Sequence, residues 1–445
     1  MMKRIIRILS VSAMCGVTLI IFNIICSATH SVSAQSSETY AIRNARIVTV
    51  TGPVIENGTV VISNGKIAAV GAGVSAPSGA KVIDAQGLSV YPGMIDADTE
   101  IGLTEIGSVA GSVDVSEIGD NNANIHVDVA IHPDSSHIAV TRVNGITTAL
   151  TAPRGGLIAG QSAIIDLDGW TPREMVLKSP AAMHINWPGL GGGRGFGGEF
   201  FGQQRSATEL RREQEKQIEN LKKILRDAAA YGDAKDARAK DPALPKQNVD
   251  LKLDALIPVV RGQLPVVINV NLERDLKAAI AFVTEMKLKA IISGGIEAYK
   301  VADQLKAKNI PVIVGPVLRV PVHEDDPYDA AFTNAGLLAK AGVKIAFQTN
   351  DSAYSRNLPY HAGMAAAFGL PKEEALKAVT IYPAEILGIA DRVGSIEQGK
   401  IANLIVTDGD PLEIRTQVKH VFINGRDVPL TSRHTELYEK YKARP

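Results

Sequence analysis

Four uniformly apolar runs in the second half of the chain alternate with stretches of helical character, and this alternation most constrains the fold. The runs cover residues 264–271, 289–295, 311–317 and 344–351. Each run ends in polar residues or glycine, as a parallel strand does when both its faces are buried and its carboxyl end opens onto a site. Strands that alternate with helices predict βα units around a parallel sheet, and therefore a fold of the α/β class.

The two flanks of this region consist of short β-branched runs separated by glycine-rich turns. One flank covers residues 35–92, and the same pattern returns over residues 391–430. Alternation bounded by Asn-Gly turns is typical of antiparallel strands. We expect the two flanks to pair as one small β-sandwich domain, followed by a tail over residues 431–445.

An insertion over residues 189–250 interrupts the alternation. Its first part, residues 189–202, is rich in glycine, and residues 206–240 form a charged run of helical character. For the loop we favour a lid that carries Phe196, Phe200 and Phe201 towards a ligand. For the charged run we favour a solvated surface helix.

The amino terminus has the three parts of a secretory signal peptide. Lys3, Arg4 and Arg7 precede an apolar run over residues 11–26, and a tail of small residues follows. The run is shorter than the roughly 20 apolar residues that span a bilayer. We expect residues 1–34 to be removed after Ala34, which predicts a periplasmic or secreted protein with no membrane segment after cleavage.

Removal of this leader changes the chemistry available to the chain. Cys15 and Cys26 are its only cysteines and both lie in the leader, so the mature chain has no disulfide, thiolate metal site or cysteine nucleophile. Of 47 basic and 47 acidic residues the leader takes three basic ones, which leaves 44 against 47 and a net charge of −3. Without a basic excess, nucleic acid and anionic membranes are not expected partners. A small molecule is the expected partner, and a homo-oligomer stays open.

Two end motifs resemble known proteins. Residues 82–103 resemble the start of the barrel in the amidohydrolase superfamily, whose motif is Pro-Gly, two apolar residues, Asp, any residue and His-x-His. Here Asp98 and Glu100 occupy the places of the two histidines. Residues 342–411 resemble the last strand and closing β-unit of imidazolonepropionase-like amidohydrolases, and Asp351 occupies the place of their general base and metal ligand. The resemblance implies a (β/α)8 TIM-type barrel over residues 93–390.

The chemistry of this superfamily implies one or two divalent cations that activate water and polarise a carbonyl group. It needs imidazoles at the ends of strands one, five and six, since neutral nitrogen donors suit zinc. Strand five ends instead in Asn269 and Asn271, and strand six in Ser293 followed by glycines. A zinc site of the usual kind is therefore not expected in this divergent member.

Three interpretations of Asp98, Glu100 and Asp351 stay open. In the first, they bind Mg, Mn or Ca together with Asn269 and Asn271, because hard cations prefer oxygen ligands. In the second there is no metal, and crowding raises the pKa of one carboxyl group so that it works as an acid or base. In the third the acids are structural, bonded to the backbone or paired with a cation. The candidate cations are Arg154, Arg319 and Lys300.

Further candidates are side chains close to the expected strand ends. The histidines of the loop after strand one, His126, His132 and His137, are more typical of a non-ligand cluster. His184 is the best candidate for an isolated imidazole ligand, and His361 is more typical of a surface or supporting histidine. The candidates for contact with substrate are Gln161, His184, Ser293, Tyr360 and His361.

The resemblance implies hydrolysis of a carbon-nitrogen bond other than a peptide bond, in a small cyclic amide or acyl-amino compound. Asp351 would be the general base. The alternative is a non-catalytic barrel that binds a small ligand or a protein partner.

Overall fold

The computed structural model describes residues 38–189 and 206–444. The predicted leader and nearly all of the predicted lid loop, with Phe196, Phe200 and Phe201, lie outside these ranges. The described residues from Thr39 onwards belong to one compact unit. Among the helices of the two described ranges, none combines the length and apolar character of a membrane span.

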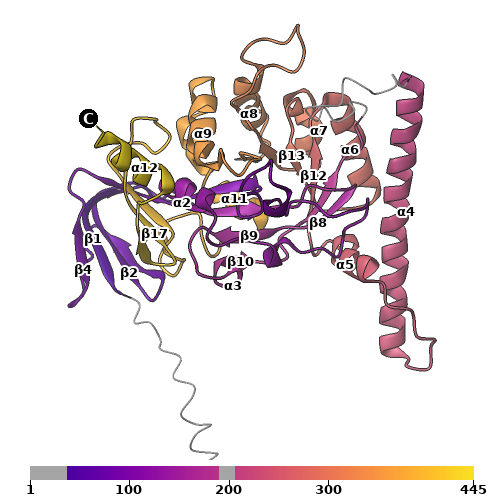
Figure 1. Ribbon diagram of the computed structural model, residues 1–445, viewed down its shortest axis with the longest axis horizontal. Coiled ribbons are helices and arrows are strands. Elements are labelled where there is room, and N and C mark those ends of the chain that lie inside the picture. Colours follow the sequence, from indigo (N-terminus) through magenta and orange to yellow (C-terminus); the bar gives the residue numbers. More distant parts are fainter. Residues whose placement is uncertain (1–37, 190–205, 445) are drawn as a thin grey trace, which may run out of the picture. The chain divides into compact units, whose positions relative to one another are not determined.

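The two flanks of the chain form a single eight-stranded sheet, in the order β18-β17-β16-β5-β1-β2-β3 with β4 paired to β1. Its strands are β1 (Tyr40–Ile47), β2 (Ile55–Ser63), β3 (Lys66–Gly71), β4 (Lys81–Asp84), β5 (Ser89–Pro92), β16 (Leu404–Thr407), β17 (Val418–Ile423) and β18 (Arg426–Val428). The antiparallel pairing of β5 with β16 joins the flanks, with Leu404 opposite Pro92 and Thr407 opposite Ser89. In Figure 1 the indigo strands of the amino-terminal flank lie beside yellow β17. The predicted pairing of the flanks is confirmed.

Asn-Gly turns close two hairpins of this sheet, as their sequences predict. Asn64 and Gly65, between β2 and β3, have φ angles of 53° and 76°. Asn424 and Gly425, between β17 and β18, have φ angles of 51° and 74°. Positive φ at both central residues is what a type I′ turn requires, and this turn matches the twist of the strands that it joins.

The remaining strands form two sheets, in the orders β10-β9-β7-β6 and β15-β14-β13-β12-β11-β8. They are β6 (Met94–Thr99), β7 (Ile146–Thr151), β8 (Ile158–Gln161), β9 (Ala163–Asp166), β10 (Val176–Lys178), β11 (Met183–Asn186), β12 (Val266–Val270), β13 (Ala290–Gly294), β14 (Val312–Val314) and β15 (Ile345–Phe347). The strands β11 to β15 are parallel to one another. The four strands predicted in the second half of the chain are thus confirmed as β12 to β15.

Helices connect and cover these strands (Figure 1). They are α2 (Ser136–Arg142), α3 (Pro172–Met175), α4 (Ala207–Lys240), α5 (Leu251–Val260), α6 (Glu273–Glu285), α7 (Ala302–Ala307), α8 (Ala330–Lys340), α9 (Leu358–Ala367), α10 (Lys372–Lys377), α11 (Ile381–Leu387) and α12 (Arg433–Lys442). Helices α6, α7 and α8 lie in the crossovers between successive parallel strands from β12 to β15. The segment expected as a tail contains α12.

One segment departs from the uniform parallel pattern. Strand β8 is antiparallel to β11, and β9 is antiparallel to β7. The physical reason is the connection over residues 152–157, since a parallel crossover needs about a dozen residues or more. A chain that turns back within so few residues has to run in the opposite direction.

The inner faces of the strands share one apolar core. It contains Ile95, Leu150, Val267, Ile291 and Ile313, from β6, β7, β12, β13 and β14, and all five are almost fully buried. Successive side chains of a strand point to opposite faces. Residues two positions further along β12 and β13 therefore lie above this core, on the same face of the strands.

A buried polar cluster links β9 to the terminal sheet. Asp166 Oδ1 accepts hydrogen bonds from Thr148 Oγ1 at 3.0 Å and from Asn403 Nδ2 at 2.7 Å. Asp166 Oδ2 accepts a third from Asn424 Nδ2 at 3.0 Å. Burial raises the pKa of Asp166, and the three hydrogen bonds oppose that effect.

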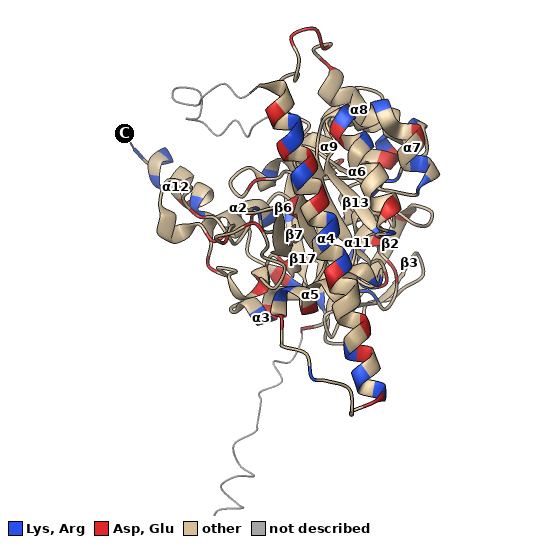
Figure 2. Ribbon diagram, turned by 90° about the vertical axis from the view of Figure 1, so that its right-hand side faces the viewer, with Lys and Arg blue, Asp and Glu red and all other residues tan. Residues whose placement is uncertain are grey.

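The charged run of the insertion forms α4, which begins with a capping box between Ser206 and Glu209. Four residues on one face of the helix are buried: Leu221, Leu225, Ala228 and Gly232. This stripe packs beside α5, and Figure 2 shows basic and acidic residues distributed along the visible part of the helix. The predicted solvated surface helix is confirmed, with one packed face.

Candidate functional site

Polar side chains lie on the inner face of three neighbouring parallel strands, level with the apolar core on β11 and above it at the carboxyl ends of β12 and β13. His184 of β11 is in register with Val267 of the core, and Asn269 of β12 is in register with Ser293 of β13. Partners in register point to the same face, so His184, Asn269 and Ser293 face the interior. The sequence predicted all three as site residues.

Asp98 and Glu100, at the end of β6, are both paired with Arg154. Arg154 Nη1 lies 2.8 Å from Asp98 Oδ1, and Arg154 Nε lies 3.1 Å from Glu100 Oε1. The Asp98 side chain is 1% exposed, that of Arg154 16% and that of Glu100 25%. This is the arrangement of the third interpretation, in which a cation neutralises the acids.

The second oxygen of Asp98 is also engaged. Ser293 Oγ donates to Asp98 Oδ2 at 2.7 Å and lies 2.8 Å from Gln348 Oε1, at the end of β15. Gln348 Nε2 in turn donates to the carbonyl oxygen of Gly315 at 2.9 Å. These contacts join the ends of β6, β13, β14 and β15 through buried side chains.

Asp351, the predicted base, follows β15 and is half-buried. Its carboxylate accepts a hydrogen bond from the backbone N–H of Tyr354 at 2.8 Å, and its carbonyl oxygen accepts one from Ser355 Oγ at 2.6 Å. Thr99 Oγ1 donates to the same carbonyl oxygen. Asp351 is therefore held against the end of β6 through its backbone.

Burial raises the pKa of Glu100, and the charges that act on this residue are those of Arg154, Asp351 and Asp98. Burial is the largest cause, Arg154 opposes it, and the carboxylates of Asp351 and Asp98 add to the increase. Asp98, Glu100 and Asp351 therefore share one electrostatic environment, as the strand-end rule predicted.

Asp96 and Thr349 are partners that the sequence analysis did not assign. Asp96 is fully buried, and its carboxylate accepts hydrogen bonds from the backbone N–H of Thr349 at 3.1 Å and from the Thr349 hydroxyl. Burial raises the pKa of Asp96 to about 7. The superfamily motif could have predicted Asp96 as a site residue, because Asp96 occupies the position of the Asp in that motif.

His184 lies near Asp98 and Arg154 but makes no ion pair with them. Burial lowers the pKa of His184 to about 4, so the imidazole is neutral at physiological pH. Within the described residues, His184 Nε2 has no hydrogen-bond partner.

Asn269 and Asn271 converge on Gly294. A Cβ atom at this glycine would lie 2.3 Å from Asn271 Oδ1 and 3.5 Å from Asn269 Oδ1. Gly294 also has a φ of 89°, which favours glycine. The two predicted amide oxygens therefore both lie next to Gly294.

The structure does not bring every candidate to this cluster. Gln161 Nε2 donates to the carbonyl oxygen of Ala123 and lies 3.3 Å from His126 Nε2. The hydroxyl of Tyr360 lies 3.3 Å from Asn144 Nδ2, in the segment that follows α2. Both side chains therefore contact other segments rather than the acids.

His361 is buried rather than exposed at the surface. Its Nδ1 accepts hydrogen bonds from the backbone N–H groups of Val317 at 2.9 Å and Leu318 at 3.2 Å. Burial lowers its pKa to about 4. His361 therefore supports the loop after β14, as a structural histidine does.

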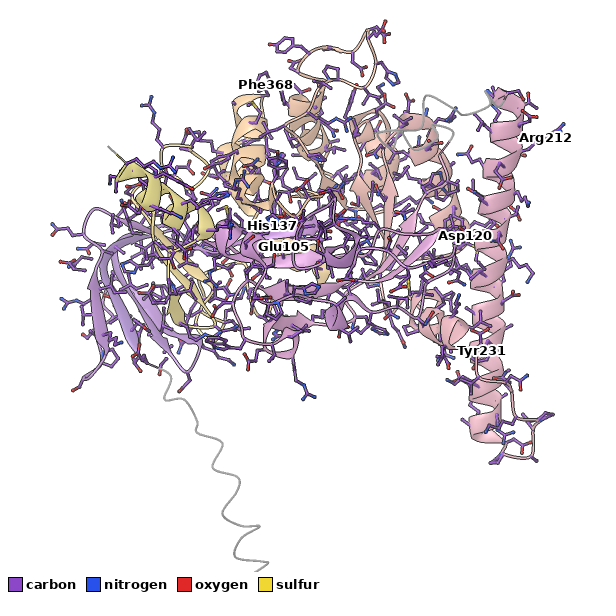
Figure 3. The ribbon with its side chains drawn as sticks, viewed as in Figure 1. Glu105, Asp120, His137, Arg212, Tyr231 and Phe368 are labelled. Carbon is purple, nitrogen blue, oxygen red and sulfur yellow. The ribbon has the colours of Figure 1, made fainter. Side chains whose placement is uncertain are left out.

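The other charged and imidazole candidates have partners elsewhere. Lys300 pairs with Glu297 at 2.7 Å, and Arg319 donates to the carbonyl oxygen of Val320. His132 contacts Asp114 at 2.8 Å. Figure 3 shows His137 beside Glu105, whose carbonyl oxygen lies 2.8 Å from His137 Nε2. Of the three candidate cations, Arg154 is the one that reaches the acids.

Comparison with known proteins agrees with this arrangement. The model of the amidohydrolase family matches residues 301–428. A solved amidohydrolase from Thermotoga maritima MSB8 superimposes with a TM-score of 0.76 at 26% identity, over 88% of this chain and 100% of that one. These matches support the amidohydrolase superfamily. The similarity of the chain to the superfamily thus extends well beyond the two end motifs.

Two curated relatives add to this assignment. Amidohydrolase tasK from Hapsidospora irregularis is 25% identical over 377 residues, which are 78% of this chain and 37% of that protein. An imidazolonepropionase from Thermoplasma volcanium is 35% identical over 107 residues, which are 22% of this chain and 26% of that protein. The matched regions thus span well under half the length of these curated relatives.

Amidohydrolases typically depend on a divalent metal, and the residues present here do not fit one. Asp98 and Glu100 replace two imidazoles, and their oxygens already contact Arg154. Within residues 38–189 and 206–444, no group of three or more His, Cys, Asp or Glu side chains is arranged to hold a metal ion. The described cluster matches neither the zinc site of the superfamily nor the predicted hard-cation site.

Proposed function

We propose that this protein hydrolyses carbon-nitrogen bonds other than peptide bonds, in a small cyclic amide or acyl-amino compound. Similarity to the amidohydrolase superfamily supports the reaction class. The observation that carries the proposal is the position of Asp351, half-buried beside Glu100 and held by Thr99, Tyr354 and Ser355. A carboxylate fixed at a strand end is well placed to move a proton.

In the proposed reaction Asp351 accepts a proton from water while the water oxygen attacks the carbonyl carbon. The proton then passes to the leaving nitrogen as the carbon-nitrogen bond breaks. Arg154 Nη2 has no hydrogen-bond partner among the described residues, so its N–H groups are available to stabilise negative charge on the carbonyl oxygen.

The test measures turnover of a panel of cyclic amides and acyl-amino compounds by the purified mature protein. We expect Asp351→Asn to lower kcat by about 10²–10⁴-fold, the usual contribution of a general base. Asp408→Asn is the matched control, since Asp408 is exposed and pairs with Lys419. The proposal fails if no compound is turned over above background, or if Asp351→Asn retains full activity.

A second candidate is a non-catalytic barrel that binds a small ligand or a protein partner. The observation that favours it is the internal pairing of Asp98 and Glu100 with Arg154, since neutralised acids are also what a structural cluster contains. Unchanged ligand binding in Asp351→Asn without any turnover would favour this candidate over hydrolysis.

We also propose that the two inner sheets close into the predicted barrel. Support comes from the hydrogen bond between the backbone N–H of Asn350 and the carbonyl oxygen of Asp98, which links the end of β15 to β6. The Ser162 N–H likewise donates to the carbonyl oxygen of Ala182, between the β8–β9 segment and the residue before β11. The shared core of Ile42, Ile62, Leu404 and Phe422 supports a sandwich built from both flanks.

Export remains part of the proposal, supported by the basic and apolar sequence of residues 1–26. Expression in a bacterial host followed by cell fractionation and mass spectrometry tests it. We expect a periplasmic or secreted product that begins at Gln35. Retention of residues 1–34 in a cytoplasmic product would contradict the proposal.

A further inference from the structure

Arg154 is fixed in place through its backbone as well as its side chain. Its N–H donates to the carbonyl oxygen of Val115 at 2.7 Å, and its own carbonyl oxygen accepts a hydrogen bond from Asn186 Nδ2 at 2.5 Å. Two residues earlier, the N–H of Ala152 donates to the carbonyl oxygen of Thr99 at 3.0 Å. The segment is thus tied to three other parts of the chain, which fixes the backbone of Arg154, while the ion pairs with Asp98 and Glu100 hold its guanidinium.

The charge of Arg154 is also fixed. Burial alone would lower its pKa, but the carboxylates of Asp98 and Glu100 outweigh burial and raise it. The guanidinium therefore stays protonated and supplies one permanent positive charge between two carboxylates.

A divalent cation would compete for the same oxygens. Metal-oxygen contacts are about 2.0–2.6 Å long for Mg²⁺ and Ca²⁺. Arg154 nitrogens already lie 2.8 Å from Asp98 Oδ1 and 3.1 Å from Glu100 Oε1. A metal bound by both acids would therefore contact the guanidinium directly, and like charges at such a distance repel strongly.

We propose that Arg154 is the resident cation of this site and takes the place of the divalent metal, so that the protein binds no divalent metal there while Arg154 is present. A role of Arg154 in the reaction rests on the proposed hydrolysis, in which its guanidinium supplies the positive charge. The exclusion of a divalent metal from the site rests on the geometry of the two ion pairs alone.

The proposal predicts what happens when the guanidinium is removed. In Arg154→Met, Asp98 and Glu100 lose their partner, and two neighbouring carboxylates without a cation attract one. We expect this variant to bind Mn²⁺ about tenfold or more tightly than the wild type does. The factor is taken from proton binding, since one nearby charge shifts the pKa of a carboxyl group by about one unit or more. The wild type should carry well below one equivalent of Zn²⁺, Mn²⁺, Mg²⁺ or Ca²⁺.

The measurement uses the full mature chain, equilibrated with each metal, passed through gel filtration and analysed by mass spectrometry for bound metal. Calorimetric titration with MnCl₂ and the metal dependence of Tm give the affinity, since a ligand that binds the folded state raises Tm. Arg142→Met is the matched control. Arg142 is 17% exposed and pairs with Asp168 at 3.0 Å, away from the acids.

Stoichiometric metal in the wild type would overturn the proposal, and so would an Arg154→Met variant that binds Mn²⁺ no better than Arg142→Met. Arg154→Lys, which keeps the positive charge, should stay metal-free, and metal binding by this variant would also overturn it. If Arg154→Met does not fold, the wild-type metal content and Arg154→Lys decide the outcome. None of these readouts uses turnover, so failure of the proposed hydrolysis is distinguishable from failure of this inference.

Discussion

Asp96 lies fully buried between the first and last strands of the inner sheets, and burial raises its pKa from 3.8 to about 7. Well below pH 3.8 the carboxyl group is protonated in both the folded and unfolded chain. As the pH rises from 4 to 7 the unfolded chain releases a proton that the folded chain retains, so the stability of the fold falls. Above pH 7 both forms are ionised and the loss stays constant.

Asp96→Asn should remove this loss, since an amide of the same shape can still accept from the Thr349 N–H and interact with the Thr349 hydroxyl. At pH 8 we expect a gain in the free energy of unfolding of up to roughly 4 kcal/mol, from about three pKa units at 1.36 kcal/mol each. At pH 4 the expected gain is only about 0.6 kcal/mol, because most of the difference in proton binding arises above this pH. Urea unfolding at pH 4, 5.5 and 8 measures the difference. A wild type and variant with parallel pH profiles would contradict it, and Asp408→Asn is the exposed control.

The sequence predicted several site residues because strand ends meet at one edge of a parallel sheet. That rule predicts that Asp98, Glu100, Asp351, Asn269 and Ser293 lie close together. It could not choose among Arg154, Arg319 and Lys300, because the contacts of a cation on an irregular segment depend on tertiary packing. For the same reason the rule does not predict the contacts of Gln161 and Tyr360, which lie with other segments. Nearness in sequence to a strand end does not fix the direction of a side chain.

At the scale of single elements, α4 combines a charged surface with one buried stripe. Arg212 lies towards one end of this helix and Tyr231 further along it, beside α5 (Figure 3). The helix depends on packing for its position, because most stability of a surface helix comes from its buried face.

Leu225→Ala tests this packed stripe, because Leu225 is fully buried. We expect a loss of about 2–5 kcal/mol in the free energy of unfolding, from lost transfer energy and the cavity left behind. Lys223→Ala, on the exposed face of the same helix, should change it by about 0.5 kcal/mol at most. Urea unfolding followed by circular dichroism measures both. Equal effects of the two substitutions would show that the stripe does not anchor α4.

Periodicity predicted the strands β12 to β15 and the helix α4, but not the reversed direction of β8 and β9. An apolar run of four residues reads the same in a parallel or an antiparallel strand. The direction of a strand is set by the length of the connection before it, and residue types alone do not reveal that direction.

At the scale of the whole molecule, the terminal sheet and the inner strands are linked through Asp166. Its carboxylate accepts hydrogen bonds from Thr148 on β7, from Asn403 before β16 and from Asn424 after β17. The sequence predicted that the two flanks pair, because their turns and alternation match. The contacts of Asp166 with Thr148, Asn403 and Asn424 could not be predicted from the sequence, since a single Asp at a strand end has many possible roles.

Asp166→Ala should weaken the attachment of the terminal sheet. Three buried donors lose their acceptor, which we expect to cost about 3–5 kcal/mol in the free energy of unfolding. Scanning calorimetry should show a lower Tm and a broader transition than that of Asp408→Ala, the exposed control. A single unshifted transition would mean that apolar packing alone holds the sheet in place.

The short connection over residues 152–157 has a consequence for how this site can change. The same turn that reverses the chain direction also carries Arg154 to the acids. One inserted residue would displace the guanidinium by up to about 3.5 Å, which exceeds the tolerance of an ion pair. The charge balance of the site is therefore encoded in the length of a loop as much as in the identity of its residues, and an insertion or deletion there could alter its metal affinity without substituting a single side chain.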